Sequence, residues 1–234
     1  MSTIAQQQAP EIRRDRGLTM DQVERWAPIG GILFVVLMVS GSFLIGDVPK
    51  ADAPQQEIAT YLADGDNLMR NIIGAYLWVV GALAFLLFLT GLRSDLRRAE
   101  GGSGTFSSLA FGAGVAFAAV WMVSAVAFSA VAYTVELRDA PITDPDLVRA
   151  LPAAGGWLLL LGGGFAGLLL LLAVAGASFR TGVYPRWLAW LGIVAAIALL
   201  FDVAYLNIGP FWVWVFIAAV VMLRQREETA REAA

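Results

Sequence analysis

Long apolar stretches recur along this chain, and they constrain its fold more than any other feature. An α-helix needs about 20 mostly apolar residues to cross the ~30 Å hydrocarbon core of a bilayer. Over the whole chain 59% of the residues are apolar and 15% are charged, whereas a soluble domain has about 45–50% and about 25%. The sequence therefore predicts an all-α protein, a bundle of helices that crosses a membrane. The five stretches of sufficient length are residues 26–46, 71–92, 110–133, 157–177 and 187–206.

A sixth apolar stretch, residues 211–223, has only 13 residues, which span about 20 Å as a helix. Residues 208–210 on one side and Arg224 on the other extend it toward a full crossing, because flanking residues snorkel and a bilayer thins locally. We therefore expect six transmembrane helices. The alternative is that the sixth stretch forms an interfacial or re-entrant end.

Arginine and lysine are distributed unevenly between the links. Twelve of the 16 lie before the first stretch, after the second, after the fourth or after the sixth. Because basic links stay on the cytoplasmic side, both termini are predicted to be cytoplasmic. The chain then divides into a cytoplasmic tail (1–25), a six-helix transmembrane domain (26–224) and a second cytoplasmic tail (225–234).

Each of the two longer outer links carries the pattern of a short amphipathic helix. In the first, Asp52 precedes Pro54, which is typical of an N-cap followed by proline in the first turn. In the second, Asp144 precedes Pro145 in the same way. We expect both helices to lie at the outer interface, each leading into the next span; the alternatives are simple turns or a lid over a ligand. The apolar faces consist of Ile58, Tyr61 and Leu62 in the first helix and of Leu147, Val148 and Leu151 in the second.

The chain contains no cysteine and no histidine. This excludes disulfides, thiolate chemistry, the usual zinc and haem ligands, and a Ser-His or Cys-His pair. A formal charge of −3 gives no basic surface for nucleic acid. We find no catalytic, cofactor-binding or metal-binding motif and expect a protein that is not an enzyme and needs no cofactor.

Asp202 is the ionisable residue that falls within a predicted span. It lies 15 residues after Trp187, about 22 Å along a helix, in the outer third of the hydrocarbon. A carboxylate there must be protonated, reach water or find a partner. It either fastens the outer end of the bundle or lines a vestibule that binds a cation or a proton. We expect it to pair with Arg70 or Arg149, directly or through water, and the amides of Asn71 and Asn207 are possible hydrogen-bond donors at the same level.

Small residues recur at every fourth position in two of the spans. Such stripes let helix backbones approach closely, so we expect the third and fourth spans to pack on each other. A hinge at Gly162–Gly164 is an alternative use of the second stripe. The stripes consist of Ala110, Gly114 and Ala118 in the third span and of Gly163 and Gly167 in the fourth.

Three arginines, Arg93, Arg97 and Arg98, follow the second span directly. At the level of the lipid head groups each would contribute about 1 kcal/mol to binding of anionic lipid. The expected partners are therefore the bilayer itself, with anionic lipid at these arginines, and a membrane-protein partner or a second copy of the chain.

Four short segments carry a resemblance to a known family. They are EIATYLAD (57–64), GAYL (74–77), LRSDLRRAEGG (92–102) and YPRWLAWLG (184–192). Together they resemble uncharacterised multi-pass membrane proteins of actinobacteria, over about residues 26–205. The resemblance implies a helix bundle in the plasma (inner) membrane of a bacterium, with no assigned activity. We therefore expect an accessory or structural bundle that binds partners; the alternative is a small transporter or channel that uses Asp202 and the acidic outer links.

Overall fold

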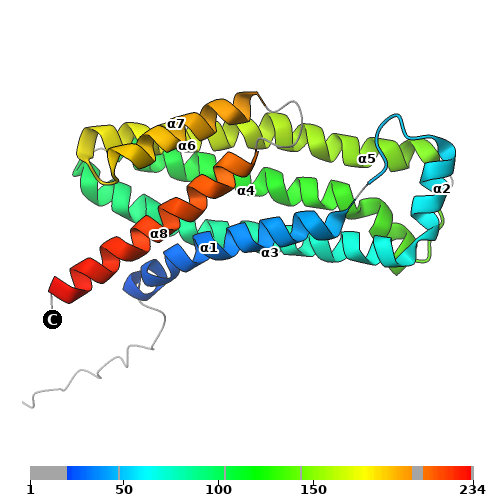
Figure 1. Ribbon diagram of the computed structural model, residues 1–234, viewed down its shortest axis with the longest axis horizontal. Coiled ribbons are helices and arrows are strands. Elements are labelled where there is room, and N and C mark those ends of the chain that lie inside the picture. Colours follow the sequence, from blue (N-terminus) through cyan, green and yellow to red (C-terminus); the bar gives the residue numbers. More distant parts are fainter. Residues whose placement is uncertain (1–19, 47, 103, 143, 202–207, 233–234) are drawn as a thin grey trace, which may run out of the picture.

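The computed structural model describes residues 20–46, 48–102, 104–142, 144–201 and 208–232, and every regular element within these ranges is a helix. Figure 1 shows an elongated bundle in which the long helices run antiparallel. The α-helices are α1 (Met20–Ile45), α2 (Gln55–Ala63), α3 (Gly65–Glu100), α4 (Thr105–Ala132), α5 (Pro145–Trp157), α6 (Gly164–Thr181), α7 (Arg186–Leu200) and α8 (Ile208–Glu232). Two π-helical segments, η1 (Tyr133–Leu137) and η2 (Leu158–Gly163), continue α4 and join α5 to α6.

The two ends of the bundle differ in what they hold. One end, here called the terminal end, contains the start of α1, the end of α8, and the α3–α4 and α6–α7 links (Figure 1). The opposite end, the cap end, contains α2, which lies across the ends of the long helices, and the α4–α5 link (Figure 1).

Within the part of the chain that the structure describes, five helical segments are long and apolar enough to cross a membrane: Glu24–Ile45, Gly65–Glu100, Thr105–Leu137, Pro145–Thr181 and Ile208–Glu228. The last of these contains the sixth apolar stretch, so this stretch belongs to a longer helix than its 13 apolar residues predicted. The short apolar helix is instead α7, with 15 residues, or about 22 Å. The rest of the predicted fifth span, residues 202–206, lies outside the described residues. A polytopic helical bundle is therefore supported, and the count of six crossings stays a prediction.

A column of phenylalanine rings fills the centre of the bundle and joins four helices. Phe85 of α3 lies 4.8 Å from Phe34 of α1 and 5.4 Å from Phe117 of α4, between ring centroids. Phe117 in turn lies 4.6 Å from Phe211 of α8. All four side chains are buried. Pairs of this kind each contribute about 0.5–1.5 kcal/mol beyond the burial of their surface, so the column fixes the positions of α1, α3, α4 and α8.

A second, smaller apolar cluster lies at the cap end. Ile58 and Tyr61 of α2 are buried there, as the predicted apolar face requires. They pack with Leu68 of α3, Val131 of α4 and Val148 of α5. This cluster holds α2 across the bundle and closes the cap end.

The two predicted helix starts at the cap end have different outcomes. Asp144 is the N-cap of α5 and accepts a hydrogen bond of 2.9 Å from the backbone N–H of Asp146. The prediction that Asp52 caps α2 is wrong, because α2 begins at Gln55 with Pro54 at the N-cap position and no side chain as its cap. Asp52 lies in the turn before it.

Helix α4 packs against both α3 and α6, and its small residues serve more than one interface. Ala110 and Ala118 are buried, but a Cβ on Gly114 would lie 2.6 Å from the methyl carbons of Leu89, which belongs to α3. Gly114 thus permits the close approach of α3 rather than α6.

The glycines of the second stripe have unequal surroundings. A Cβ on Gly167 would lie 3.1 Å from Leu199 of α7 and 3.4 Å from Phe117 of α4, so this glycine lies where three helices meet. A Cβ on Gly163 would meet its first neighbours, Val120 and Leu159, only at 3.9 Å. Gly163 lies in the π-helical segment η2, which continues directly into α6.

Candidate functional site

The predicted polar site near the cap end is only partly within the described residues. Asn71 of α3 is fully buried, and its Nδ2 donates a hydrogen bond of 3.4 Å to the backbone carbonyl of Ile45 in α1. Its Oδ1 is buried and has no hydrogen-bond partner among the described residues, which is costly for a polar atom. Asp202 and Asn207, the other predicted members at this level, lie outside the described residues.

Arg149 of α5 connects two segments of the chain at the cap end. Its Nε and Nη2 donate hydrogen bonds of 3.0 and 2.9 Å to the carbonyl oxygen of Ala53, and its Nη1 pairs with Asp146 at 2.7 Å. Arg149 therefore ties the segment before α2 to α5. Arg70 is exposed and forms no ion pair with another described residue. The pairing of Asp202 with either arginine stays a prediction.

A network of charged and polar groups lies at the terminal end, and it was missed by sequence reasoning. Asp95 of α3 is at its centre: its Oδ2 accepts a hydrogen bond of 3.2 Å from the hydroxyl of Tyr184, and its Oδ1 lies 3.6 Å from Arg98 and 3.9 Å from Arg226 of α8. Arg98 pairs with Glu24 of α1, which also accepts a hydrogen bond of 2.8 Å from Ser94. Arg226 donates to the backbone carbonyl of Glu24.

The negative charges of two carboxylates and the positive charges of two guanidinium groups are thus equal in number in this network. The side chains of Asp95 and Glu24 are 17% and 19% exposed, so their charges are largely removed from water and depend on these partners. Gly91 makes the arrangement possible: a Cβ there would collide with Ala27 of α1 and lie 3.1 Å from Nη2 of Arg226.

Tyr184 connects the network to the link between α6 and α7. Burial raises the pKa of Tyr184 well above its ordinary value, and the neighbouring Asp95 carboxylate, which accepts the hydrogen bond, raises this pKa further. The phenol therefore stays protonated and remains a donor at any physiological pH. The network joins α1, α3, the α6–α7 link and α8, and its arrangement is that of a structural clamp.

The three arginines predicted to bind anionic lipid have different environments. The guanidinium of Arg93 lies over the ring of Phe111, 4.7 Å from its centroid, and Arg98 is engaged with Glu24 and Asp95. Arg97 is exposed. Of the three, Arg97 is therefore the side chain with its charge most available to a lipid head group.

Neither the arrangement of the acidic side chains nor similarity to known proteins identifies a chemistry for these sites. Among the described residues, no group of three or more Asp or Glu side chains is arranged to hold a metal ion. Comparison of the chain with protein-family models, curated proteins and solved structures finds no match.

Proposed function

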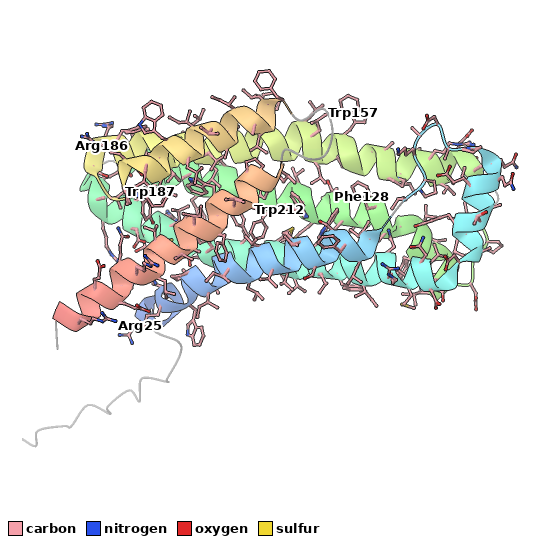
Figure 2. The ribbon with its side chains drawn as sticks, in the orientation of Figure 1. Arg25, Phe128, Trp157, Arg186, Trp187 and Trp212 are labelled. Carbon is pink, nitrogen blue, oxygen red and sulfur yellow. The ribbon has the colours of Figure 1, made fainter. Side chains whose placement is uncertain are left out.

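We propose that the protein crosses a bacterial plasma membrane six times with its terminal end in the cytoplasm and its cap end outside. The uneven distribution of arginine supports this orientation, and Arg25 and Arg186 both lie at the terminal end (Figure 2). Exposed tryptophans support the cytoplasmic boundary, because tryptophan gathers at membrane interfaces: Trp26, Trp187 and Trp190 are exposed on α1 and α7, the helices that start at the terminal end (Figure 2).

Reporter fusions test this orientation directly. A reporter that is active only in the cytoplasm should be active when fused after Ala234 and inactive when inserted at Asp139, in the α4–α5 link. A reporter that is active only outside should show the opposite. The arrangement places three crossings between Asp139 and Ala234, so equal readouts at the two positions, which require an even number, would contradict it.

Within this arrangement we propose an accessory or structural role, exerted by binding a membrane-protein partner or a second copy of the chain. The observation that carries the proposal is the phenylalanine column of Phe34, Phe85, Phe117 and Phe211. These rings occupy the centre of the bundle, where a transporter or channel needs polar groups and water along its path. An apolar, densely packed centre supports a scaffold instead.

The lipid part of the proposal concerns Arg97. Its exposed guanidinium, beside Arg93 and Arg98, is suited to anionic head groups at the cytoplasmic surface. Lipids that co-purify in mild detergent, measured by mass spectrometry, test it: Arg97→Gln should lower the anionic fraction, and the exposed Arg231→Gln at the end of α8 is the matched control.

Photo-crosslinking in cells tests the accessory role. A photoreactive phenylalanine analogue is placed at exposed positions on four different helices, Phe43, Val126, Phe165 and Val194. We expect one face to yield a protein adduct of a single mass, whereas the other faces label lipid only. Lipid labelling from all four faces would contradict a protein partner.

Cation flux into proteoliposomes tests the alternative, a small transporter or channel that uses Asp202 and the acidic outer links. The accessory role predicts no flux above that of protein-free vesicles. Flux that disappears in Asp202→Asn would overturn the accessory role in favour of transport.

A further inference from the structure

An apolar groove lies between α3 and α4 on the surface of the bundle, near the cap end. Its volume is about 360 Å³, within the ~300–1,000 Å³ range of ligand pockets. The two aliphatic hydroxyls on this side of the groove are already used, since Ser129 and Thr134 donate to the backbone carbonyls of Ala125 and Ala130. The groove therefore suits an alkyl chain. It is lined by Ile72, Ala75, Tyr76 and Val79 of α3 and by Ala125, Val126, Ser129, Ala130, Tyr133 and Thr134 of α4 and η1.

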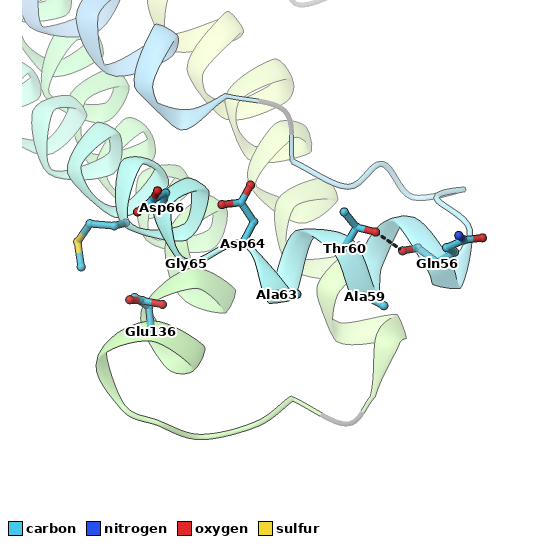
Figure 3. Close-up of a pocket in the computed structure, with 9 residues that line it drawn as sticks. Gln56, Ala59, Thr60, Ala63, Asp64, Gly65, Asp66 and Glu136 are labelled. Carbon is cyan, nitrogen blue, oxygen red and sulfur yellow. Dashed lines mark hydrogen bonds between the residues drawn. The ribbon is translucent and has the colours of Figure 1, made fainter.

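A second, open groove lies in the angle between α2, the first turn of α3 and η1, and Figure 3 shows its acidic side chains. Three of its lining residues are Asp64, Asp66 and Glu136. None of the three forms an ion pair with another described residue. Arg70 and Arg138, the neighbouring cations in the sequence, do not line it.

The two grooves follow each other along the same helix faces. On α3, Met69 lines the acidic groove, and Ile72 and Tyr76, three and seven residues later, line the apolar one; residues at these spacings share one face of a helix. On the other side, Tyr133 lines the apolar groove and Glu136 the acidic one. Both belong to η1, and π-helical turns of this kind occur frequently at functional sites.

The three carboxylates line one groove, so their negative charges repel one another unless a cation binds among them. The N-terminus of α3 accommodates Asp64 and Asp66, and Asp64 accepts a hydrogen bond of 3.1 Å from the N–H of Asn67. Glu136 adds a third negative charge from another element: its Oε2 would lie 3.2 Å from a Cβ on Gly65, so it rests against the first turn of α3. The three do not converge as metal ligands, which favours a larger, more diffuse cation.

We propose that these grooves bind one amphiphile, with its alkyl chain between α3 and α4 and an ammonium head group among Asp64, Asp66 and Glu136. The occupant is a long-chain amine that enters from the outer leaflet. Tyr76 and Tyr133, both exposed beside the apolar groove, suit the boundary between chain and head group because tyrosine has an apolar ring and a polar tip. The inference rests on the proposed membrane location but not on the accessory role.

Photolabelling of the purified full chain in neutral nanodiscs tests the proposal. Three probes share one diazirine-bearing alkyl chain and end in a primary amine, an alcohol or a carboxylate. Mass spectrometry then locates the label. We expect the amine to label peptides of residues 69–79 and 125–136 about fivefold more than the alcohol, which is the order of effect of one favourable charge interaction, and the carboxylate less than both.

Matched variants separate the two parts of the site. Ala130→Trp fills the apolar groove and should abolish labelling by all probes there, whereas Val123→Trp, on an exposed part of α4 outside the groove, should not. The triple variant Asp64→Asn, Asp66→Asn, Glu136→Gln should reduce the amine to the level of the alcohol; asparagine at position 64 preserves the helix cap.

The control for the triple variant removes an equal charge elsewhere: Asp52→Asn, Glu57→Gln, Asp139→Asn, none of which lines either groove. It should leave the preference for the amine intact. Equal labelling by all three head groups, or the same loss in the control triple variant, would overturn the proposal. These outcomes do not depend on crosslinks to a protein partner, so they are independent of the accessory role.

Discussion

The hydroxyl of Tyr184 donates a hydrogen bond to Asp95, 89 residues earlier in the chain. This contact links the turn between α6 and α7 to the last turns of α3, and through Arg226 and Glu24 it reaches both terminal helices. Because helices in a bilayer are not pressed together by the hydrophobic effect, polar contacts of this kind and close packing hold such a bundle in one arrangement.

Removing the charge of Asp95 should destabilise the terminal end. In Asp95→Asn the residue keeps its shape and still accepts from Tyr184, but Arg226 and Arg98 lose their carboxylate. We expect a loss of about 1–3 kcal/mol, measured by thermal unfolding in detergent. The double variant with Arg226→Gln should lose less than the sum of the two single losses. The exposed Glu228→Gln on α8 serves as control, and additive losses would show that Asp95 and Arg226 act independently.

Tyr61 should make the stability of the protein sensitive to alkaline pH. Burial raises its pKa from 10.0 to about 12, so the folded state holds the phenol proton more tightly than the unfolded state. This contribution is fully present below pH 10 and is lost as the pH rises toward 12, at ~1.4 kcal/mol per pKa unit of difference.

Tyr61→Phe should therefore remove part of the alkaline loss of stability, measured as the unfolding temperature between pH 8 and pH 12. The variant should also be no less stable at neutral pH, because the Tyr61 hydroxyl is buried and finds no hydrogen-bond partner in the described part of the chain. The exposed Tyr76→Phe is the matched control. An alkaline profile of Tyr61→Phe identical to that of the parent would refute the assignment.

Leucine should be tolerated less well at Gly167 than at Gly163. A Cβ at Gly167 already comes within 3.1 Å of Leu199 and 3.4 Å of Phe117, so Gly167→Leu forces α4, α6 and α7 apart, and overpacking of this kind costs about 1–3 kcal/mol. A Cβ at Gly163 meets its first neighbours only at 3.9 Å, so Gly163→Leu should cost less. Thermal unfolding in detergent measures both, and the reverse order would contradict the packing described for this interface.

Double-mutant cycles test whether Asp202 pairs with Arg70 or with Arg149. Arg149→Gln should destabilise the protein on its own account, since it loses Asp146 and the carbonyl of Ala53, so the single variant carries no information on the pairing. The informative quantity is the coupling of each arginine variant with Asp202→Asn in thermal unfolding. We expect one of the two cycles to be non-additive; additivity in both would exclude the pairing.

The class of the protein and the positions of most of its helices could be predicted from the sequence, because they depend on local properties. Apolar content over about 20 consecutive residues decides whether a segment suits a bilayer, and the Asp144-Pro145 helix start needs only its neighbours. The buried face of α2 could also be predicted, since the spacing of Ile58 and Tyr61 is a property of one helix.

Contacts between helices were decided by the tertiary structure alone. Glu24 and Arg226 fall in the predicted tails, and Asp95 stands among arginines, so no local pattern distinguished them from solvated charges. Gly114 belongs to a stripe that predicts close packing, but which helix fills the space depends on how α4 is rotated, and here α3 does. Likewise the alignment of Met69, Tyr76, Tyr133 and Glu136 arises only when α3 and η1 lie side by side. Periodicity places a residue on a face of its own helix, whereas the relative rotation and depth of two helices depend on packing over their whole length.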